Sequence, residues 1–368
     1  MAKKQTKYYS LDRILSMNAT YNMIIGERSN GKTYACLKYG LQRFVETGEQ
    51  MGIVRRWDSD YRGKNGQVMF DSLETNGAIA EMTGGEWTGV YYWSGRWYLC
   101  RYDEEQKREK METPFAYAFA INTMEHDKST SYPGITTVVF DEFLTRINYL
   151  PNEFVLFMNV LSTIIRDRNN VKIFMLGNTV NKFCPYFSEM GLKHVWNMEP
   201  GTIDVYKYGK GKLTVAVEYC KARKEGKASD VYFAFDNPKL QMITGGAWEI
   251  DIYPHCPYKH RPKDILFMYW IEFDRHLLQC EVIQYEGAFY TYIHRKTGEI
   301  KHPESDVIFS PEWSPLPNHR RFITKPTDEL GKKIALHYRQ DKIFYQDNEV
   351  GEIVRNYLIF CGKSANAV

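Results

Sequence analysis

Eight residues near the N-terminus have the types and spacing needed to bind the phosphates of a nucleotide. They read GERSNGKT, from Gly26 to Thr33, and fit the pattern G-x-x-x-x-G-K-[ST]. The apolar run before them predicts a strand and the spacing after them predicts a helix, which is the context that this pattern requires. In such a loop, backbone N–H groups and the positive end of the helix form a cradle for a polyphosphate.

Each position of this loop carries an expectation. We expect Lys32 to reach the β and γ phosphate oxygens and to act in catalysis, and Thr33 to bind Mg²⁺ through its hydroxyl. The other loop residues surround the phosphates: Gly26, Glu27, Arg28, Ser29, Asn30 and Gly31. The loop therefore predicts a site for ATP and Mg²⁺. The alternative is a glycine-bearing turn with a chance Lys-Thr pair.

A second segment supplies the carboxylates that ATP hydrolysis requires. The run from Ile135 to Phe140 is apolar and β-branched, as in a strand buried on both faces, and Asp141 and Glu142 follow at its end. Open α/β sheets bind ligands at the carboxyl ends of their strands. We expect Asp141 to hold Mg²⁺ and Glu142 to activate the attacking water. A strand that ends in two solvated acids is the alternative.

A third apolar run, residues 171–180, follows a helical pattern at residues 152–166. A strand–helix–strand unit after the acids is the arrangement of the additional-strand, catalytic-glutamate (ASCE) branch of P-loop ATPases. Asn178 falls where that branch has a polar sensor of the γ-phosphate, and it is a candidate nucleotide contact. A turn residue beside Gly177 is an equal alternative.

Composition limits the class of protein. A chain of 368 residues has room for two domains, and it lacks a bilayer-spanning apolar stretch and the apolar core of a signal peptide. We therefore expect a soluble, intracellular protein without a membrane partner. The seven cysteines are scattered without a CxxC pair, which indicates neither a zinc site nor a disulfide framework.

Basic residues gather in short clusters, although the net charge is only +3. The aromatic content of 15% is high, and basic and aromatic groups together suit phosphates and unpaired bases. A solvated charged face is the alternative for each cluster. The clusters lie at residues 55–56, 107–110, 221–224, 319–321 and 332–333.

The chain divides into an α/β ATPase domain with a parallel β-sheet core at residues 1–200, a linker with a hairpin at 201–228, and a smaller C-terminal α+β domain at 229–368. Within the first domain we expect a strand at 51–56. Its arginines, Arg55 and Arg56, could contact nucleotide or a neighbouring subunit, or pair with acids such as Asp58 and Asp60. Residues 85–121 predict antiparallel strands with a turn at Ser94-Gly95.

The C-terminal domain reads as three consecutive strands within residues 265–294, followed by helices near 330–340 and 349–361. This order suggests an α+β unit of ribonuclease-H type. Asp274 is the candidate metal ligand on the first strand, but a nuclease of this class needs several clustered carboxylates. We interpret the domain as a binding module that has lost, or never had, cleavage chemistry.

Together, GERSNGKT, VVFDEF and the MLGNT strand resemble the DNA-encapsidation ATPases of small podophages, within the terminase-like packaging motors. The resemblance is strongest over residues 20–180. It implies ATP hydrolysis that moves double-stranded DNA into a procapsid. It also implies a homo-oligomeric ring, a pentamer, in the host cytoplasm and transiently at the portal vertex, with a packaging RNA as a further partner. It further implies that the C-terminal domain is a vestigial nuclease fold that attaches to nucleic acid or procapsid.

The resemblance also implies an arginine, just after the acidic pair, that acts on the neighbouring subunit's nucleotide. Arg146 occupies that place and is our third catalytic candidate; Arg166 and Arg168 are runners-up, and a surface ion pair is the alternative for each. Two rival functions remain. One is a stand-alone nucleic-acid-stimulated ATPase or helicase, although no second RecA-like core is evident after residue 200. The other is a non-hydrolysing nucleotide-binding vertex protein, in which Glu142 would have no task.

Overall fold

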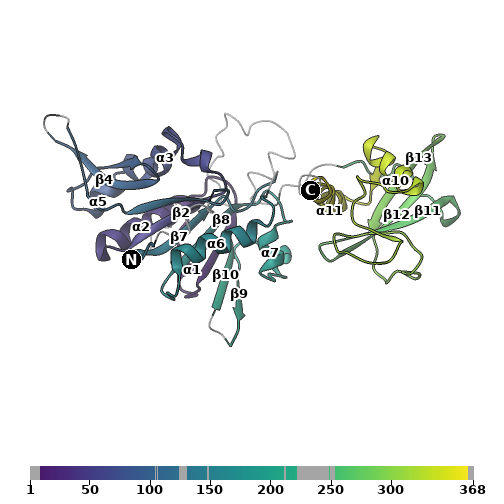
Figure 1. The fold of residues 1–368 in the computed structure, drawn as a ribbon, viewed down its shortest axis with the longest axis horizontal. Coiled ribbons are helices and arrows are strands. Elements are labelled where there is room, and N and C mark those ends of the chain that lie inside the picture. The colour runs from purple at the N-terminus through teal and green to yellow at the C-terminus, as the bar shows by residue number, and fades with distance from the viewer. Residues whose placement is uncertain are drawn as a thin grey trace. The chain divides into compact units, whose positions relative to one another are not determined.

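The computed structural model describes residues 9–103, 105, 107–123, 131–146, 149–210, 213–221, 248 and 253–363. The chain forms two compact units, residues 1–249 and 250–368, which Figure 1 shows. Of the expected domain boundaries, the one at residues 228–229 lies outside the described residues.

A ten-stranded mixed sheet forms the centre of the first unit. The strands β6, β2, β7, β8, β1 and β10 are neighbours in this order and run parallel, whereas β3, β4, β5 and β9 pair antiparallel. In order across the sheet they are β3 (Gly89–Trp93), β4 (Arg96–Tyr102), β6 (Ala116–Ala120), β2 (Gln50–Arg55), β7 (Ile135–Asp141), β8 (Lys172–Asn178), β1 (Tyr21–Gly26), β10 (Leu213–Tyr219) and β9 (Ile203–Tyr208), with β5 (Arg108–Lys110) beside β4.

Helices cover both faces of this sheet, which explains why its central strands are apolar throughout. Successive strand residues point to opposite faces. Met23 and Ile25 therefore pack in the core around α6 (Glu153–Ile165), while Ile24 packs in the core around α2 (Lys32–Thr47). Shorter helices complete the unit: α1 (Asp12–Leu15), η1 (Asp58–Tyr61), α3 (Lys64–Gln67), η2 (Val68–Phe70), α4 (Asp71–Thr75), α5 (Ala78–Met82), α7 (Pro185–Glu189) and η4 (Val195–Asn197).

Two features of the strand order concern the predicted site. β8 lies between β1, which ends in the phosphate loop, and β7, which ends in the acids. The hairpin β9–β10 belongs to the same sheet, because β10 pairs with β1. A domain end at residue 200 is therefore too early: without the hairpin, β1 would be an unpaired edge.

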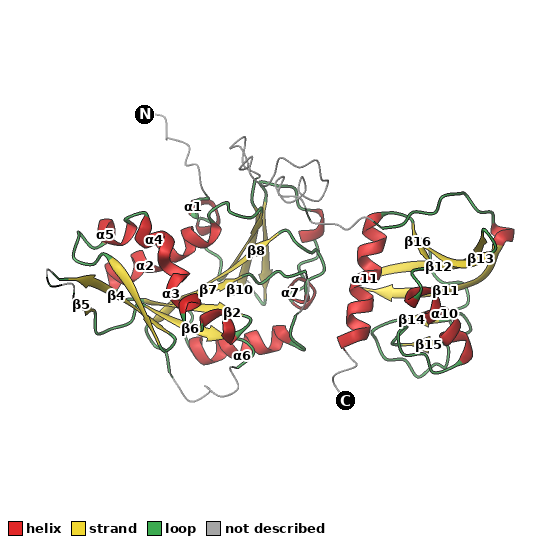
Figure 2. Cartoon of the chain, turned by 90° about the horizontal axis from the view of Figure 1, so that it is seen from above, coloured by secondary structure: helices red, strands yellow, loops and turns green. Residues whose placement is uncertain are grey.

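The second unit is built on a six-stranded sheet of order β15-β14-β11-β12-β13-β16. The expected three-stranded meander is present, with β14 added in parallel to β11. Asp274 lies in the turn after β11 at φ 46°, not on the strand as expected. The elements are η5 (Pro262–Asp264), β11 (Ile265–Phe273), β12 (His276–Tyr285), β13 (Ala288–Arg295), β14 (Ile308–Phe309), β15 (His319–Arg320), α10 (Glu329–Arg339), β16 (Ile343–Tyr345) and α11 (Asn348–Lys363), most of them labelled in Figure 2.

The described residues contain no helix that is both long and apolar enough to cross a membrane. They also contain no group of three or more His, Cys, Asp or Glu side chains arranged to hold a metal ion. All seven cysteines are free thiols.

Candidate nucleotide site

The phosphate loop joins the end of β1 to the start of α2. Gly31 caps the helix at φ 93°, a left-handed conformation that glycine adopts at little cost. The Asn30 side chain accepts a hydrogen bond from the backbone N–H of Lys32 at 3.2 Å. At the other end, a Cβ on Gly26 would lie 2.8 Å from Cys220 Cβ, so the loop start has no room for a side chain. The loop is thus a turn with a glycine at each end that leads into the N-terminus of α2.

Lys32 is buried within this loop. Its Nζ donates to the Glu27 carbonyl at 2.7 Å, to Asn178 Oδ1 at 3.2 Å and to the Gly26 carbonyl at 3.4 Å. Burial lowers the pKa of the Lys32 amine to about 8, although Asp141 nearby acts in the opposite direction. The backbone carbonyls of the phosphate loop therefore hold the Lys32 side chain in place.

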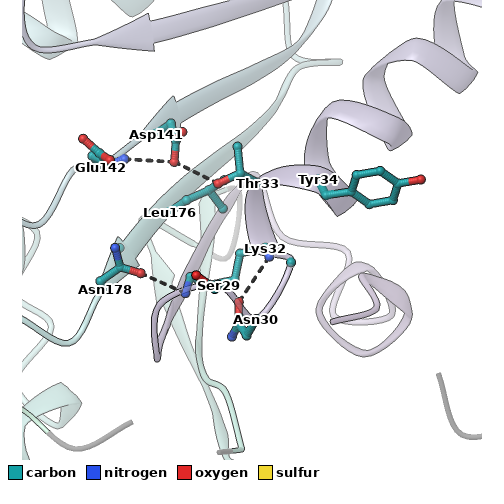
Figure 3. Close-up of a pocket in the computed structure, with 11 residues that line it drawn as sticks. Ser29, Asn30, Lys32, Thr33, Tyr34, Asp141, Glu142, Leu176 and Asn178 are labelled. Carbon is teal, nitrogen blue, oxygen red and sulfur yellow. Dashed lines mark hydrogen bonds between the residues drawn. The ribbon is translucent and has the colours of Figure 1, made fainter. Parts of the chain in front are cut away.

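Asp141 ends β7 and faces the start of α2, as Figure 3 shows. Thr33 Oγ1 donates to Asp141 Oδ1 at 3.2 Å, and an Arg55 guanidinium nitrogen donates to Asp141 Oδ2 at 2.7 Å. Burial raises the pKa of this carboxyl group, and Arg55 opposes the rise. The two predicted Mg²⁺ ligands, Thr33 and Asp141, are thus direct neighbours.

Glu142 turns away from Asp141 at φ 60°, and its side chain is 62% exposed. Arg55 pairs with it as well, at 3.1 Å from Nη1 to Oε2, and so bridges both acids. Pairing of the arginines with Asp58 or Asp60 was one of our expectations, but Asp58 pairs with Arg62. The reason is the strand order: β2 lies beside β7 with Val54 opposite Phe140, which brings Arg55 next to Asp141.

Arg56 stabilises the backbone turn at Glu142 and Phe143 from its buried side. Its guanidinium forms two hydrogen bonds with Glu153, at 2.7 and 2.9 Å, and donates to the carbonyls of Glu142 at 3.3 Å and Phe143 at 2.9 Å. Tyr186 donates to Glu153 at 2.9 Å. This buried network fixes the backbone that carries Glu142. Glu153 could not be identified from the sequence, because an acid at the start of a helix carries no signal of a buried partner.

A cavity of about 260 Å³ lies between the loop and the acids (Figure 3). Asn178, at the end of β8, lines it and accepts its hydrogen bond from Lys32 inside it. The lining residues are Ser29, Asn30, Gly31, Lys32, Thr33, Tyr34, Asp141, Glu142, Leu176, Gly177 and Asn178. The structure thus brings residues 29–33 of the predicted loop, both acids and the asparagine to one place, whereas the predicted residues Gly26, Glu27 and Arg28 do not line the cavity.

The three candidate arginines lie apart from this lining. Arg146 donates to the Val180 carbonyl at 3.4 Å, and Arg166 ends α6 at φ 50°. Arg168 donates to the carbonyls of Pro133 and Ile135 at 2.9 and 2.6 Å, and so ties the end of α6 to the start of β7. Arg168 therefore has a structural task within its own chain.

The residues that line the cavity fit a magnesium ion together with the phosphates of a nucleotide. Mg²⁺ prefers oxygen ligands and binds through one or two carboxylates together with substrate phosphates. The Thr33 hydroxyl and the Asp141 carboxylate supply such oxygens at the edge of the cavity, beside a lysine amine and a helix N-terminus for the phosphates.

Comparison with known proteins decides the family. A family model described as Podovirus DNA encapsidation protein (Gp16) matches residues 3–83 and 108–308. The chain belongs to this family. The match includes the phosphate loop and both acids, which confirms the resemblance inferred from the sequence.

Individual relatives and a solved structure extend this comparison. The DNA packaging proteins of Bacillus phage phi29 and Bacillus phage PZA are each 31% identical over 183 residues, which is 49% of this chain and 49% of theirs. By that measure the chain spans about half the length of the curated relatives it matches. A chain in the solved bacteriophage Phi-29 viral genome packaging motor assembly shares the fold, with a TM-score of 0.55 at 18% identity over 97% of this chain and 99% of that chain.

Proposed function

We propose that the chain is a subunit of a viral DNA packaging motor that hydrolyses ATP to move double-stranded DNA into a procapsid. One observation carries the proposal: in a DNA encapsidation protein, the phosphate loop and the Asp141–Glu142 pair meet across a cavity, with Thr33 and Asp141 in contact. A protein that only bound nucleotide would not need the second acid.

The loop residues bind and orient the substrate. Backbone N–H groups at the start of α2 receive the phosphates of ATP, and the Lys32 ammonium moves from the loop carbonyls to the phosphate oxygens. Thr33 and Asp141 would hold Mg²⁺, which neutralises charge on the phosphates when it is bound. Asn178 accepts from Lys32 through Oδ1, so its amide nitrogen is the donor that can sense a γ-phosphate.

Glu142 is the residue that orients and deprotonates the attacking water. Arg55 engages Oε2 of Glu142, and a water would bind the other carboxylate oxygen. Arg56 fixes the backbone of the same residue through its carbonyl, so the position of the base is set from two neighbouring residues of β2. Placement of this kind is a large part of what a phosphoryl-transfer enzyme supplies.

We also infer the class of each unit and how copies of the chain assemble. The position of β8 between β1 and β7 supports the ASCE branch, and the meander with β14 parallel to β11 supports a ribonuclease-H-like second unit that binds packaging RNA or procapsid. Five copies would form a ring at the procapsid portal vertex in the host cytoplasm. Arg146 would stabilise the transition state in the neighbouring copy.

Three variants test the hydrolytic site. Glu142→Gln should keep ATP affinity but lower turnover by about 10²–10⁴-fold, because only the base is lost. Lys32→Ala should weaken both binding and turnover. Glu46→Gln changes an exposed acid in the last turn of α2, remote from the loop, and should behave as wild type. Phosphate release with procapsids and DNA is the assay, and near-normal turnover of Glu142→Gln would reject the assignment.

Mixtures of inactive variants test Arg146. Arg146→Ala subunits should bind ATP and fail alone. They retain Glu142, so they should regain hydrolysis beside Glu142→Gln subunits, which still supply Arg146. If mixed assemblies never recover activity although both variants assemble and bind ATP, Arg146 does not act between subunits.

A further inference from the structure

The strands β3, β4 and β5 form a ribbon at the edge of the first sheet, where Figure 2 labels β4 and β5. One face of this ribbon presents aromatic and basic side chains. Strand alternation sorts the residues: Val90, Trp97 and Leu99 point into the core around α2, and their neighbours point to the opposite face. That opposite face, which we call the ribbon face, consists of Tyr91, Trp93, Arg96, Tyr98, Tyr102, Arg108 and Lys110.

The aromatic residues of the ribbon face are unusual for a sheet edge. Trp93 and Tyr102 are 58% and 59% exposed. Tyr91 lies opposite Tyr98 across the strands, with their ring centroids 6.4 Å apart. Exposed edge strands ordinarily avoid such residues because they invite association, so large exposed rings here indicate a binding surface.

The charged residues of the ribbon face are all basic. The Arg108 guanidinium lies 3.7 Å from the ring centroid of Tyr91, and the Lys110 ammonium lies 4.3 Å from that of Tyr98. Both cations are exposed, as is Arg96. The rings thus hold the cations in a fixed layer above the sheet, at little further entropic cost on binding.

The neighbouring acids of the described ribbon are directed elsewhere or engaged. Glu109 alternates to the other face, where it pairs with Arg101 at 2.7 Å. In the turn beyond Tyr102, Asp103 accepts from the backbone of Lys107 and Glu105 pairs with the Lys107 side chain. The strand residues of the ribbon face therefore carry positive charge and no carboxylate. The nearby Glu74 carboxylate, at the Gly89 end of β3, is engaged by the backbone N–H of Val90 at 3.1 Å.

We propose that the ribbon face binds a nucleic-acid strand with unpaired bases. Cations held against aromatic rings suit a phosphate backbone, and the exposed rings of Trp93 and Tyr102 suit stacking by bases. A duplex would use the cations but not the rings, because its bases are already stacked on one another. The exposed rings therefore favour an unpaired strand as the ligand of this face. The ligand thus differs from the double-stranded DNA that the motor is proposed to move.

Most of the ribbon face lies outside the family match, although Arg108 and Lys110 lie within it. The family match omits residues 84–107, which hold β3 and β4. The proposal rests on the ribbon itself and does not depend on ATP hydrolysis.

Fluorescence anisotropy with the full chain tests the proposal. The probes are labelled oligothymidine, oligouridine and a DNA duplex of equal length. Trp93→Ala and Tyr102→Ala should each weaken binding of the single strands about tenfold, the typical effect of losing one stacked base, and leave duplex affinity unchanged. Arg96→Gln and Arg108→Gln should each reduce the salt slope of single-strand binding by about 0.7.

Trp57→Ala is the matched control, because Trp57 is a 40% exposed tryptophan of the first unit that lies outside the ribbon face. Its single-strand affinity should equal that of wild type, and all variants should keep the wild-type melting temperature. Unchanged single-strand binding by the Trp93→Ala/Tyr102→Ala double variant would overturn the proposal. So would a double variant that alters self-association in light scattering but not oligonucleotide affinity, since the face would then be a contact between copies.

Discussion

Raising the pH from 7 to 9 should weaken ATP binding through the titration of Lys32. Burial lowers the pKa of this amine to about 8 in the nucleotide-free protein. If the phosphates bind only the ammonium form, the apparent affinity follows its population. That population is about one half at pH 8 and about one tenth at pH 9, so the Kd should rise about tenfold between pH 7 and pH 9.

Isothermal titration calorimetry measures both parts of this prediction. At pH 8, buffers of different ionisation enthalpy should reveal uptake of about half a proton per ATP bound, because the phosphates restore the charge on Lys32. The terminal phosphate does not interfere, since its own pKa lies near 6. Lys32→Arg is the control: a guanidinium stays charged, so its Kd should not change with pH.

The same pKa has the opposite consequence for the stability of the nucleotide-free protein. Above pH 8 the unfolded chain holds the Lys32 proton more tightly than the folded chain. The free energy of unfolding should therefore rise with pH relative to Lys32→Met, by about 1.4 kcal/mol per unit at most. A Kd that stays within twofold from pH 7 to pH 9, with no proton uptake, would refute the reasoning.

Contacts in the first unit give three more predictions. Arg55→Met removes the cation beside Asp141, so the pKa of that carboxyl should rise further. As the pH is lowered, the variant should then lose Mg²⁺-dependent binding of a fluorescent ATP analogue at a higher pH than wild type does, and overlapping pH profiles would contradict this. Glu153→Ala leaves Arg56 buried without its partner and should cost about 3–5 kcal/mol in urea unfolding, with Glu153→Gln in between. Gly66→Ala would set a Cβ 2.2 Å from the Tyr92 ring and should cost about 1–3 kcal/mol, part of which Tyr92→Ala should restore in the double variant.

The chemistry of the nucleotide site could be predicted from the sequence because each part lies within one short segment. The loop from Gly26 to Thr33 carries its own turn residues, and β7 carries its acids at its end. The β3–β4 hairpin was equally local: Ser94 and Gly95 both have positive φ, as a tight turn requires. The pattern of apolar and turn residues within each short segment was therefore sufficient to predict these elements.

Pairings between distant segments could not be predicted in this way. Arg55 meets Asp141 because β2 and β7 are neighbours, and Arg56 meets Glu153 because α6 begins beneath the same turn. Nothing in residues 203–219 distinguishes a linker hairpin from one that extends a sheet, since the partner strand β1 is remote in sequence. The short helices between Asp58 and Met82 also lack a repeated apolar period.

The place of β1 in the sheet has a consequence for how the protein is made. β1 is complete by Gly26, but its two neighbours, β8 and β10, end only at Asn178 and Tyr219. Ribosomes add about 5–20 residues per second, so the strand that leads into the phosphate loop waits roughly ten seconds or more for both partners. During this interval its apolar edge is open to pairing with other nascent chains. Fragments for folding studies should therefore extend past Cys220, and a nascent chain arrested before β10 should fail to retain ATP even though its phosphate loop is already outside the ribosome.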